Sequence, residues 1–265
     1  MACRGAASVT PRRVPLSNVA AGDRRLEGAT AHYVAHVLRL GAGDEFTAFD
    51  PAAVREADAV VIEVERDSVV IRLGSVREGS LRAPRSITWV QGLVKGDKCD
   101  AVVRDATELG ATRIVLSATR RSVIRLDVAR GLARRARWTN IAEQAARQCG
   151  RSDVPEVGTS KRWEDALDSC ASADVRFCLW EGATEPLAQP LLDALARGAR
   201  LAFACGPEGG LDEDEVRIAA DRGWVTASLG PLILRTETVA AAVLGAVLIW
   251  ADSFGDVAQS RRMVR

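Results

Sequence analysis

Four consecutive polar residues, Arg235, Thr236, Glu237 and Thr238, stand between two apolar stretches near the end of this 265-residue chain. Ahead of them the segment "VTASLG" is typical of a buried strand, and behind them residues 239–250 are apolar throughout. A guanidinium and a carboxylate in that position either pair and cap the following helix, with Thr236 or Thr238 as its N-cap, or face a ligand. The pattern alone leaves both possibilities open.

A second segment of chemical interest is the glycine-rich loop "GPEGG" at residues 206–210. Its glycines permit unusual φ angles and close backbone approach. The acidic run 212–215 then suits the first turn of a helix, but it would repel a phosphate at that helix end. The chain contains neither G-x-G-x-x-G after a strand nor G-x-x-x-x-G-K-[ST], so a dinucleotide or nucleoside triphosphate is disfavoured. On spacing alone, the loop is a tight strand-to-helix turn.

The elements that would position these segments alternate from residue 86 onward. Short apolar runs predict strands at 87–94, 112–117, 175–180, 200–206 and 225–230, and the periodicity between them predicts helices at 97–110, 127–148, 163–171, 187–197 and 212–222. Gly110 and Gly150 stand where two of these helices should end. The alternation predicts an α/β fold with a mostly parallel sheet. Ligands of such sheets bind beyond the carboxyl ends of the strands, which draws attention to the loops within 179–184, 205–216 and 229–238.

The first 80 residues have a different character. Runs at 45–50, 59–65 and 68–74 predict strands, and residues 30–44 predict a short helix closed by Gly41. The polar segment 80–86 is the expected linker. The sequence therefore predicts a small β-rich domain over residues 1–80 and an α/β domain over residues 81–265.

Composition favours a folded protein of the cytoplasm. Charged residues make up 27% of the chain, and six cysteines stand singly without a C-x-x-C pair, as expected of reduced thiols. The N-terminus lacks the apolar core of a signal peptide, and the apolar run 239–250 is shorter than a membrane span of roughly 20 residues. His32 and His36 have metal-ligand spacing, but no third ligand lies nearby, so no metal is expected.

The loop "GPEGG" together with "LGPLILRTET" closely resembles the signature loops of the bacterial 16S rRNA (uracil-N3)-methyltransferases, knotted (SPOUT-type) enzymes that use S-adenosylmethionine. The stretches "HVLRLGAGDEFTAFD", "KGDKCDAVVRDATELGA" and "AARQCGRSDVPEV" fit the same family in order, so the resemblance covers nearly the whole chain. It implies a PUA-like RNA-binding β-barrel for residues 1–80, a methyltransferase domain threaded into a trefoil knot for residues 81–265, and a homodimer.

The resemblance also implies residue roles. N3 of uridine must lose its proton before it attacks the methyl group, and a positioned cation would stabilise the resulting charge on O2 and O4. Arg235 is the expected cation, and Glu237 or Glu208 the expected proton acceptor. The expected cofactor site comprises Leu179, Gly206, Pro207, Glu208, Gly209, Gly210, Leu229, Gly230, Pro231, Leu234, Thr236 and Thr238. The chain departs from the family pattern at Leu232, Arg147 and Pro51, where an arginine, a glutamate and a glycine are usual.

Arginines are concentrated in the middle of a chain whose net charge is only +1. Between Arg113 and Arg151 there are ten arginines and two acids, a local balance of +8, with no lysine. Arginine without interleaved acids suits phosphate contact. We expect RNA, held in a groove between the two domains, to contact Arg12, Arg13, Arg39, Arg120, Arg121, Arg134, Arg135 and Arg151, with the target uridine splayed out of the RNA.

Two alternatives stay open beside methylation of 16S rRNA near the decoding region. One is an enzyme of the same fold that acts on tRNA or on another rRNA base. The other is a non-catalytic RNA-binding factor for ribosome assembly, which the leucine at position 232 would favour. Failure to bind S-adenosylmethionine would select this last alternative.

Overall fold

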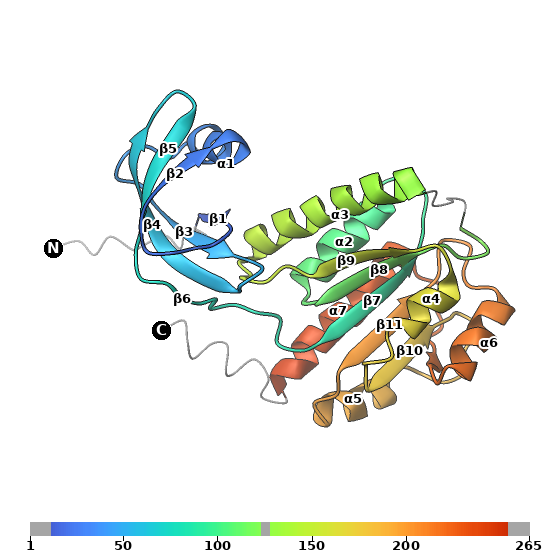
Figure 1. Ribbon diagram of the computed structural model, residues 1–265. Coiled ribbons are helices and arrows are strands. Elements are labelled where there is room, and N and C mark those ends of the chain that lie inside the picture. Colours follow the sequence, from blue (N-terminus) through green and yellow to red (C-terminus); the bar gives the residue numbers. More distant parts are fainter. Residues whose placement is uncertain (1–11, 123–127, 254–265) are drawn as a thin grey trace. The chain divides into compact units, whose positions relative to one another are not determined.

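The computed structural model describes residues 12–122 and 128–253 and divides the chain into two compact units (Figure 1). The first unit runs to Leu81 and also includes Gly150–Asp153. The second comprises Arg82–Cys149 and the chain from Val154 onward. A four-residue segment of the later sequence thus belongs to the N-terminal unit.

The first unit is built on a six-stranded sheet with the order β1-β3-β4-β5-β2, and β6 also pairs with β4. Its strands are β1 (Arg13–Pro15), β2 (Gly22–Glu27), β3 (Glu45–Asp50), β4 (Arg55–Val64), β5 (Ser68–Leu73) and β6 (Arg77–Glu78). All pairs are antiparallel except β1 with β3. The predicted strands β3, β4 and β5 are confirmed, whereas β1, β2 and β6 were not predicted, because each is short and polar or broken by arginines.

The helix of this unit ends earlier than predicted. It consists of α1 (Gly28–His32) and a π-helical turn, η1 (Tyr33–Val37). At the end of this helix, Arg39 adopts the left-handed conformation, with φ of 54°. Gly41 lies two residues further along the chain and has an ordinary negative or extended φ. The prediction that Gly41 closes the helix is therefore wrong, because a non-glycine residue adopts the left-handed conformation first.

Arg13, Glu56 and Ser152 form a buried polar cluster in the first unit. Arg13 Nη2 lies 3.0 Å from Glu56 Oε2 and donates to Ser152 Oγ at 2.9 Å, and Ser152 Oγ donates to the same carboxylate at 2.9 Å. Arg77 reaches the other oxygen of Glu56 at 3.1 Å. Ser152 comes from the segment Gly150–Asp153, so this cluster fixes that segment in the unit.

The second unit contains a six-stranded sheet with the order β12-β10-β11-β7-β8-β9, parallel throughout. Its strands are β7 (Ile87–Gly92), β8 (Arg113–Ser117), β9 (Glu156–Ser160), β10 (Val175–Leu179), β11 (Leu201–Cys205) and β12 (Val225–Ala227). The predicted α/β fold with a mostly parallel sheet is confirmed. Strand β9, "EVGTS", was not predicted because it is largely polar and lies at the edge of the sheet.

Helices cover both faces of this sheet (Figure 1). Alternating side chains explain why: in β10, Phe177 and Leu179 point to one face and Cys178 to the other. The first face packs on α2 (Lys98–Glu108), α3 (Val128–Cys149), α5 (Ala188–Ala196) and α7 (Thr236–Ser253); the second packs on α4 (Trp163–Asp168) and α6 (Glu213–Asp221). The predicted helix ends at Gly110 and Gly150 are confirmed by their φ angles of 93° and 85°.

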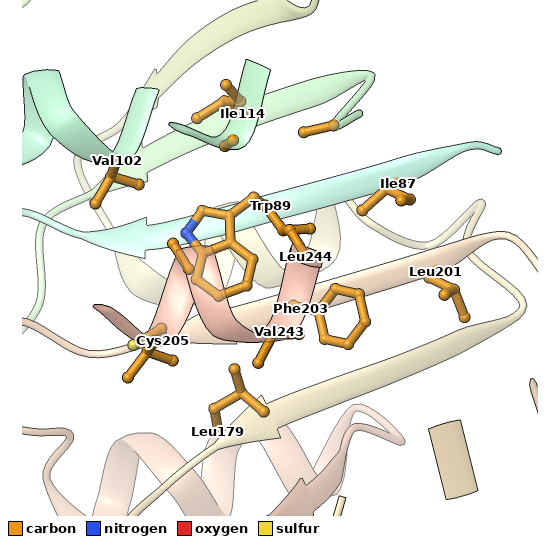
Figure 2. Packing of buried hydrophobic residues seen from close by; sticks show 14 of the residues in the cluster. Ile87, Trp89, Val102, Ile114, Leu179, Leu201, Phe203, Cys205, Val243 and Leu244 are labelled. Carbon is orange, nitrogen blue, oxygen red and sulfur yellow. The ribbon is translucent and has the colours of Figure 1, made fainter. Parts of the chain in front are cut away.

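The larger core lies between the first face and α7 (Figure 2). Trp89 of β7 and Phe203 of β11 are fully buried, with ring centroids 6.0 Å apart, and Val243 and Leu244 of α7 pack on them. Burying one such aromatic side chain contributes about 2–3 kcal/mol. This packing fixes the start of α7 against the carboxyl edge of the sheet.

Two further expectations concern the chain as a whole. The trefoil threading that the family resemblance implies stays a prediction. Within the described residues, no helix has both the length and the hydropathy needed to cross a bilayer.

Candidate active site

The loops singled out in the sequence meet at one edge of the parallel sheet. Strands β12, β10, β11 and β7 are consecutive neighbours and run in the same direction. Their carboxyl ends therefore lie side by side, and so do the segments that follow them: residues 228–235, 180–183, 206–210 and 93–98. Such an edge is where open α/β sheets bind ligands.

A cavity of about 560 Å³ lies among these segments, within the second unit. Its volume falls in the range of roughly 300–1,000 Å³ usual for small-molecule sites. Its wall combines apolar side chains, backbone of the glycine loop and four charged side chains. The lining residues include Leu179, Gly206, Pro207, Glu208, Gly210, Leu229, Gly230, Pro231, Leu234, Arg235 and Thr236.

A chain of hydrogen bonds ties the glycine loop to the start of α7. Trp89 Nε1 donates to Gln91 Oε1 at 3.1 Å, and Gln91 Nε2 donates to Thr236 Oγ1 at 2.7 Å. Thr236 Oγ1 in turn donates to the carbonyl oxygen of Gly206 at 2.8 Å. Gln91 is fully buried and Thr236 nearly so. Thr236 therefore joins two loops that are 30 residues apart.

Gly206 allows these loops to approach closely. A Cβ at this position would lie 2.8 Å from the carbonyl carbon of Gly210 and 2.9 Å from the backbone nitrogen of Leu211. Those atoms belong to the turn itself and cannot move independently, so any larger residue would open the turn. The glycine is required by the shape of the cavity wall.

The charged side chains of the cavity differ in their partners. Lys98 Nζ donates to Glu208 Oε1 at 3.0 Å, and both side chains remain about two-fifths exposed. Burial tends to raise the pKa of Glu208, but the hydrogen bond and charge of Lys98, together with backbone hydrogen bonds, outweigh it and hold the pKa below its usual value. Arg235 is exposed, and its side chain makes no hydrogen bond or ion pair to any residue that the structure describes. Its guanidinium is available to a ligand.

Cys205, also in the cavity wall, is unsuited to nucleophilic chemistry. Burial raises its pKa to about 11, and a thiol that stays protonated is a poor nucleophile. The five cysteines within residues 12–122 and 128–253 are all free, as expected of reduced thiols.

Two residues of the predicted cofactor site and one predicted proton acceptor do not line the cavity. Gly209 uses its carbonyl oxygen to accept from Arg121 Nη1 at 2.8 Å. Thr238 is exposed on α7. Glu237 is half-buried, with Oε2 inaccessible to solvent and without a hydrogen-bond partner among the described residues. The roles of these three residues stay predictions. Because α7 starts at Thr236, its first turn carries Glu237 and Thr238 away from the cavity wall.

Several residues of the cavity wall are not among the predicted site residues. Lys98 and Glu181 are charged, but neither lies in the glycine loop or in residues 229–238. The others are mainly apolar: Trp180, Ala183, Cys205, Ser228, Leu232, Ile233 and Val239. Lys98 follows β7, and only the strand order places that loop beside β11.

The predicted RNA-binding arginines fall into different environments. Arg13 and Arg151 are buried, Arg13 against Glu56 and Arg151 against Asp153, so their guanidinium groups are already paired inside the protein. Arg120 is exposed but pairs with Asp212 and Asp214 at the start of α6, at 2.9 and 2.6 Å. Arg135 is exposed, with Nε bound to the carbonyl oxygen of Val157. The remaining predicted contacts also lie at least partly at the surface: Arg12, Arg39, Arg121 and Arg134.

Comparison with known proteins identifies the family. Residues 81–248 match the RNA methyltransferase domain, and residues 26–74 match the PUA domain of RNA methyltransferases. The chain belongs to the RNA methyltransferase family. The match to the methyltransferase domain spans the whole parallel sheet and the cavity at its edge.

Individual relatives support the assignment of this chain to the RNA methyltransferase family. Ribosomal RNA small subunit methyltransferase E of Bacillus subtilis is 30% identical over 84% of this chain and 88% of its own length. The enzyme of the same name from Mycobacterium bovis is 32% identical, over 84% of each chain. The structure of the Neisseria gonorrhoeae enzyme of this name, bound to S-adenosylmethionine, matches with a TM-score of 0.81 and 27% identity, over 90% of this chain and 97% of that one.

Proposed function

We propose that this protein transfers the methyl group of S-adenosylmethionine to N3 of a specific uridine in 16S rRNA of the small ribosomal subunit, in the cytoplasm. One observation carries this proposal: the glycine loop and the segment 228–236 enclose a single cavity in a domain that matches RNA methyltransferases. The names of the relatives supply the substrate class.

The cavity suits S-adenosylmethionine in size and in chemistry. Leu179, Leu234 and Val239 offer apolar surface to an adenine ring, and the backbone of Gly206 and Gly210 lies open to the cavity. Leu229 and Gly230 close the same wall. When bound, S-adenosylmethionine supplies a methyl group on a sulfonium, already activated for transfer. Positioning is then the main task of the protein.

Arg235 is the residue that we assign to the developing negative charge on uracil. Loss of the N3 proton spreads charge onto O2 and O4, and a fixed cation in a partly closed cavity stabilises it. Arg235 adjoins Thr236, whose buried hydroxyl is fixed to Gly206 and Gln91. The backbone that carries the guanidinium is thus fixed, and Arg235 lines the cavity.

Neither predicted carboxylate is a strong candidate for the base. The pKa of Glu208 is lowered by Lys98, and a weakly basic carboxylate removes an imide proton poorly. Glu237 does not line the cavity. We propose that Glu208 and Lys98 act as an ion pair at the cavity wall and that the N3 proton leaves to solvent, with Arg235 stabilising the anion.

Arginines and apolar side chains at the surface support the proposed partners. Arg12 and Arg39 of the first unit, and Arg134 and Arg135 of the second, present cations for an RNA backbone. Leu232, Ile233 and Ile249 are 76%, 88% and 70% exposed in the second unit, which supports the homodimer. Size-exclusion chromatography with light scattering tests the dimer.

Nucleoside analysis of rRNA tests the activity. In a strain without this gene, 16S rRNA should lack 3-methyluridine, and the modification should return when the gene is restored but not when Arg235→Ala is supplied. Persistence of 3-methyluridine in the deletion strain would refute the assignment.

A further inference from the structure

The four charged side chains of the cavity comprise one neutralised pair and two free charges. Lys98 and Glu208 are 3.0 Å apart and offset each other. The side chains of Arg235 and Glu181 make no hydrogen bond or ion pair to any described residue. Arg235 is already assigned to the anionic pyrimidine. Glu181 is an exposed carboxylate that lines the cavity, so it is available to a positively charged part of a ligand.

The backbone at Glu181 is fixed by a turn that follows β10. Ala183 N donates to Trp180 O at 3.2 Å, and Trp180 N donates to Ala227 O at 3.1 Å. Glu181 occupies the second position of this turn, one residue beyond Trp180 and two beyond the buried Leu179. Its side chain therefore starts from a defined point at the cavity edge.

Gly210 leaves space that the Glu181 side chain occupies. A Cβ on Gly210 would lie 2.3 Å from Glu181 Oε1 and 3.2 Å from Cδ, so the carboxylate rests against the bare Cα of this glycine. Gly210 also has φ of 72°, in the region that favours glycine. The glycine loop thus leaves room for the carboxylate as well as for a ligand.

We propose that Glu181 recognises the positive charge of the sulfonium of S-adenosylmethionine and so distinguishes the methyl donor from its product. This inference rests on the proposed function. S-adenosylhomocysteine, the product, keeps the adenosine, the ammonium and the carboxylate but has a neutral thioether sulfur. A carboxylate near the sulfur attracts the donor and gives no such attraction to the product. The cavity thereby favours exchange of spent cofactor for fresh donor.

A hydrogen-bonding role would behave differently. If Glu181 accepts hydrogen bonds from the ribose hydroxyls, donor and product should lose affinity equally when the carboxylate is replaced. The ratio of the donor affinity to the product affinity therefore distinguishes charge recognition from hydrogen bonding. A general change in the cavity would alter both affinities by the same factor and leave this ratio unchanged.

Calorimetric titration of the full chain with S-adenosylmethionine and with S-adenosylhomocysteine tests the proposal. Glu181→Gln should weaken donor binding roughly fivefold, as expected for a partly solvated ion pair, and should change product binding by less than about twofold. Glu185→Gln is the matched control, because Glu185 is exposed on the same loop and does not line the cavity. It should change neither affinity.

Salt provides a second measurement on the unmodified protein. Because charge attraction is screened, the preference for donor over product should fall as salt concentration rises, and this fall should be absent in Glu181→Gln. An equal loss for both ligands, no loss for either, or a salt-independent preference would overturn the inference. If the unmodified chain binds neither ligand, the proposed function itself fails, which is a distinguishable result.

Discussion

Each unit of the molecule contains a cation–carboxylate pair at the same distance, and the two pairs serve different ends. Arg13 and Glu56 are 3.0 Å apart with side chains 6% and 2% exposed, whereas Lys98 and Glu208 are 3.0 Å apart with side chains 40% and 38% exposed. The first pair is enclosed with Ser152 and fixes a chain segment. The second faces the cavity, where water and ligands compete for both charges. Distance alone therefore does not reveal the role of a pair; burial and the remaining partners do.

Removal of Glu56 should give the largest effect. Glu56→Ala leaves the buried guanidinium of Arg13 unpaired, and we expect a loss of about 3–5 kcal/mol in the free energy of unfolding. Chemical denaturation measures it. Asp58→Ala is the control, because Asp58 also pairs with Arg77 but is 76% exposed; it should cost less than about 1 kcal/mol. Equal losses in the free energy of unfolding for the two variants would contradict the distinction between buried and exposed ion pairs.

The same carboxylate should make stability depend on pH. Burial tends to raise the pKa of Glu56, but hydrogen bonds from Ser152 and Arg13 outweigh it and hold the pKa below its usual value. A lowered pKa stabilises the fold above the usual glutamate value, and this contribution is lost as pH falls through the folded-state pKa. The stability difference between the unmodified chain and Glu56→Gln should therefore narrow below about pH 4. A constant difference would contradict the ionised pair.

Arg235→Ala should affect turnover and leave stability intact. Loss of the cation assigned to the pyrimidine should lower turnover by roughly 10²–10³-fold, as for a lost oxyanion donor, because Arg235 is exposed and has no described partner in the fold. Affinity for S-adenosylmethionine should stay nearly unchanged. Methyl transfer to rRNA, calorimetry and thermal unfolding are the measurements, with Arg200→Ala as control, since Arg200 pairs with Asp174 away from the cavity. Parallel losses of binding and stability would make Arg235 structural.

Thr236→Val should lower both the stability of the fold and the function of the cavity, each by less than the preceding substitutions. The substitution removes the donor to Gly206 O and one of the three acceptors of Gln91 Nε2, which keeps Gly92 O and Gly206 O. The loss of two buried hydrogen bonds should cost about 1–3 kcal/mol. Unfolding stability and cofactor affinity should fall together. Thr238→Val, at an exposed position on the same helix, should change neither. Unchanged cofactor affinity in Thr236→Val would separate this hydrogen-bond chain from the cavity.

Arg134→Ala tests the charges that we assign to RNA. Removal of one phosphate contact should reduce the slope of RNA affinity against salt concentration by about one and weaken binding similarly for different sequences. Fluorescence anisotropy with 16S rRNA fragments measures both quantities. The amount of methylated RNA formed at saturating RNA concentration should be unaffected. An unchanged slope would remove Arg134 from the RNA-binding surface.

Lys98→Met should have the smallest effect on the fold. An exposed pair contributes about 0.2–1 kcal/mol, so the free energy of unfolding should change within that range, in contrast to Glu56→Ala. Chemical denaturation of the two variants side by side provides the check. A loss of several kcal/mol would show that solvent exposure does not distinguish the two pairs.

Local patterns explain why much of the second unit could be predicted. Apolar runs such as "RLAFACG" are continuous because a parallel strand is buried on both faces, and Cys99, Val102, Val103 and Ala106 share a face because a helix repeats every 3.6 residues. Strand β9 escaped prediction because an edge strand needs no such apolar run. The first unit was less predictable, since β1 and β2 are held mainly by pairing with distant strands.

The amino-acid sequence by itself determined the alternation of strands and helices, the places where glycines end α2 and α3, and the two loops whose residues resemble those of methyltransferases. These properties depend on neighbouring residues, so they can be inferred locally. Tertiary structure decided which charges are available. Arg13 and Arg235 are both arginines to which the sequence assigns a functional role. Long-range packing encloses Arg13 with Glu56 and Ser152, whereas it leaves Arg235 at the cavity. The strand order, too, is a long-range property, and it alone places Lys98 in the cavity wall.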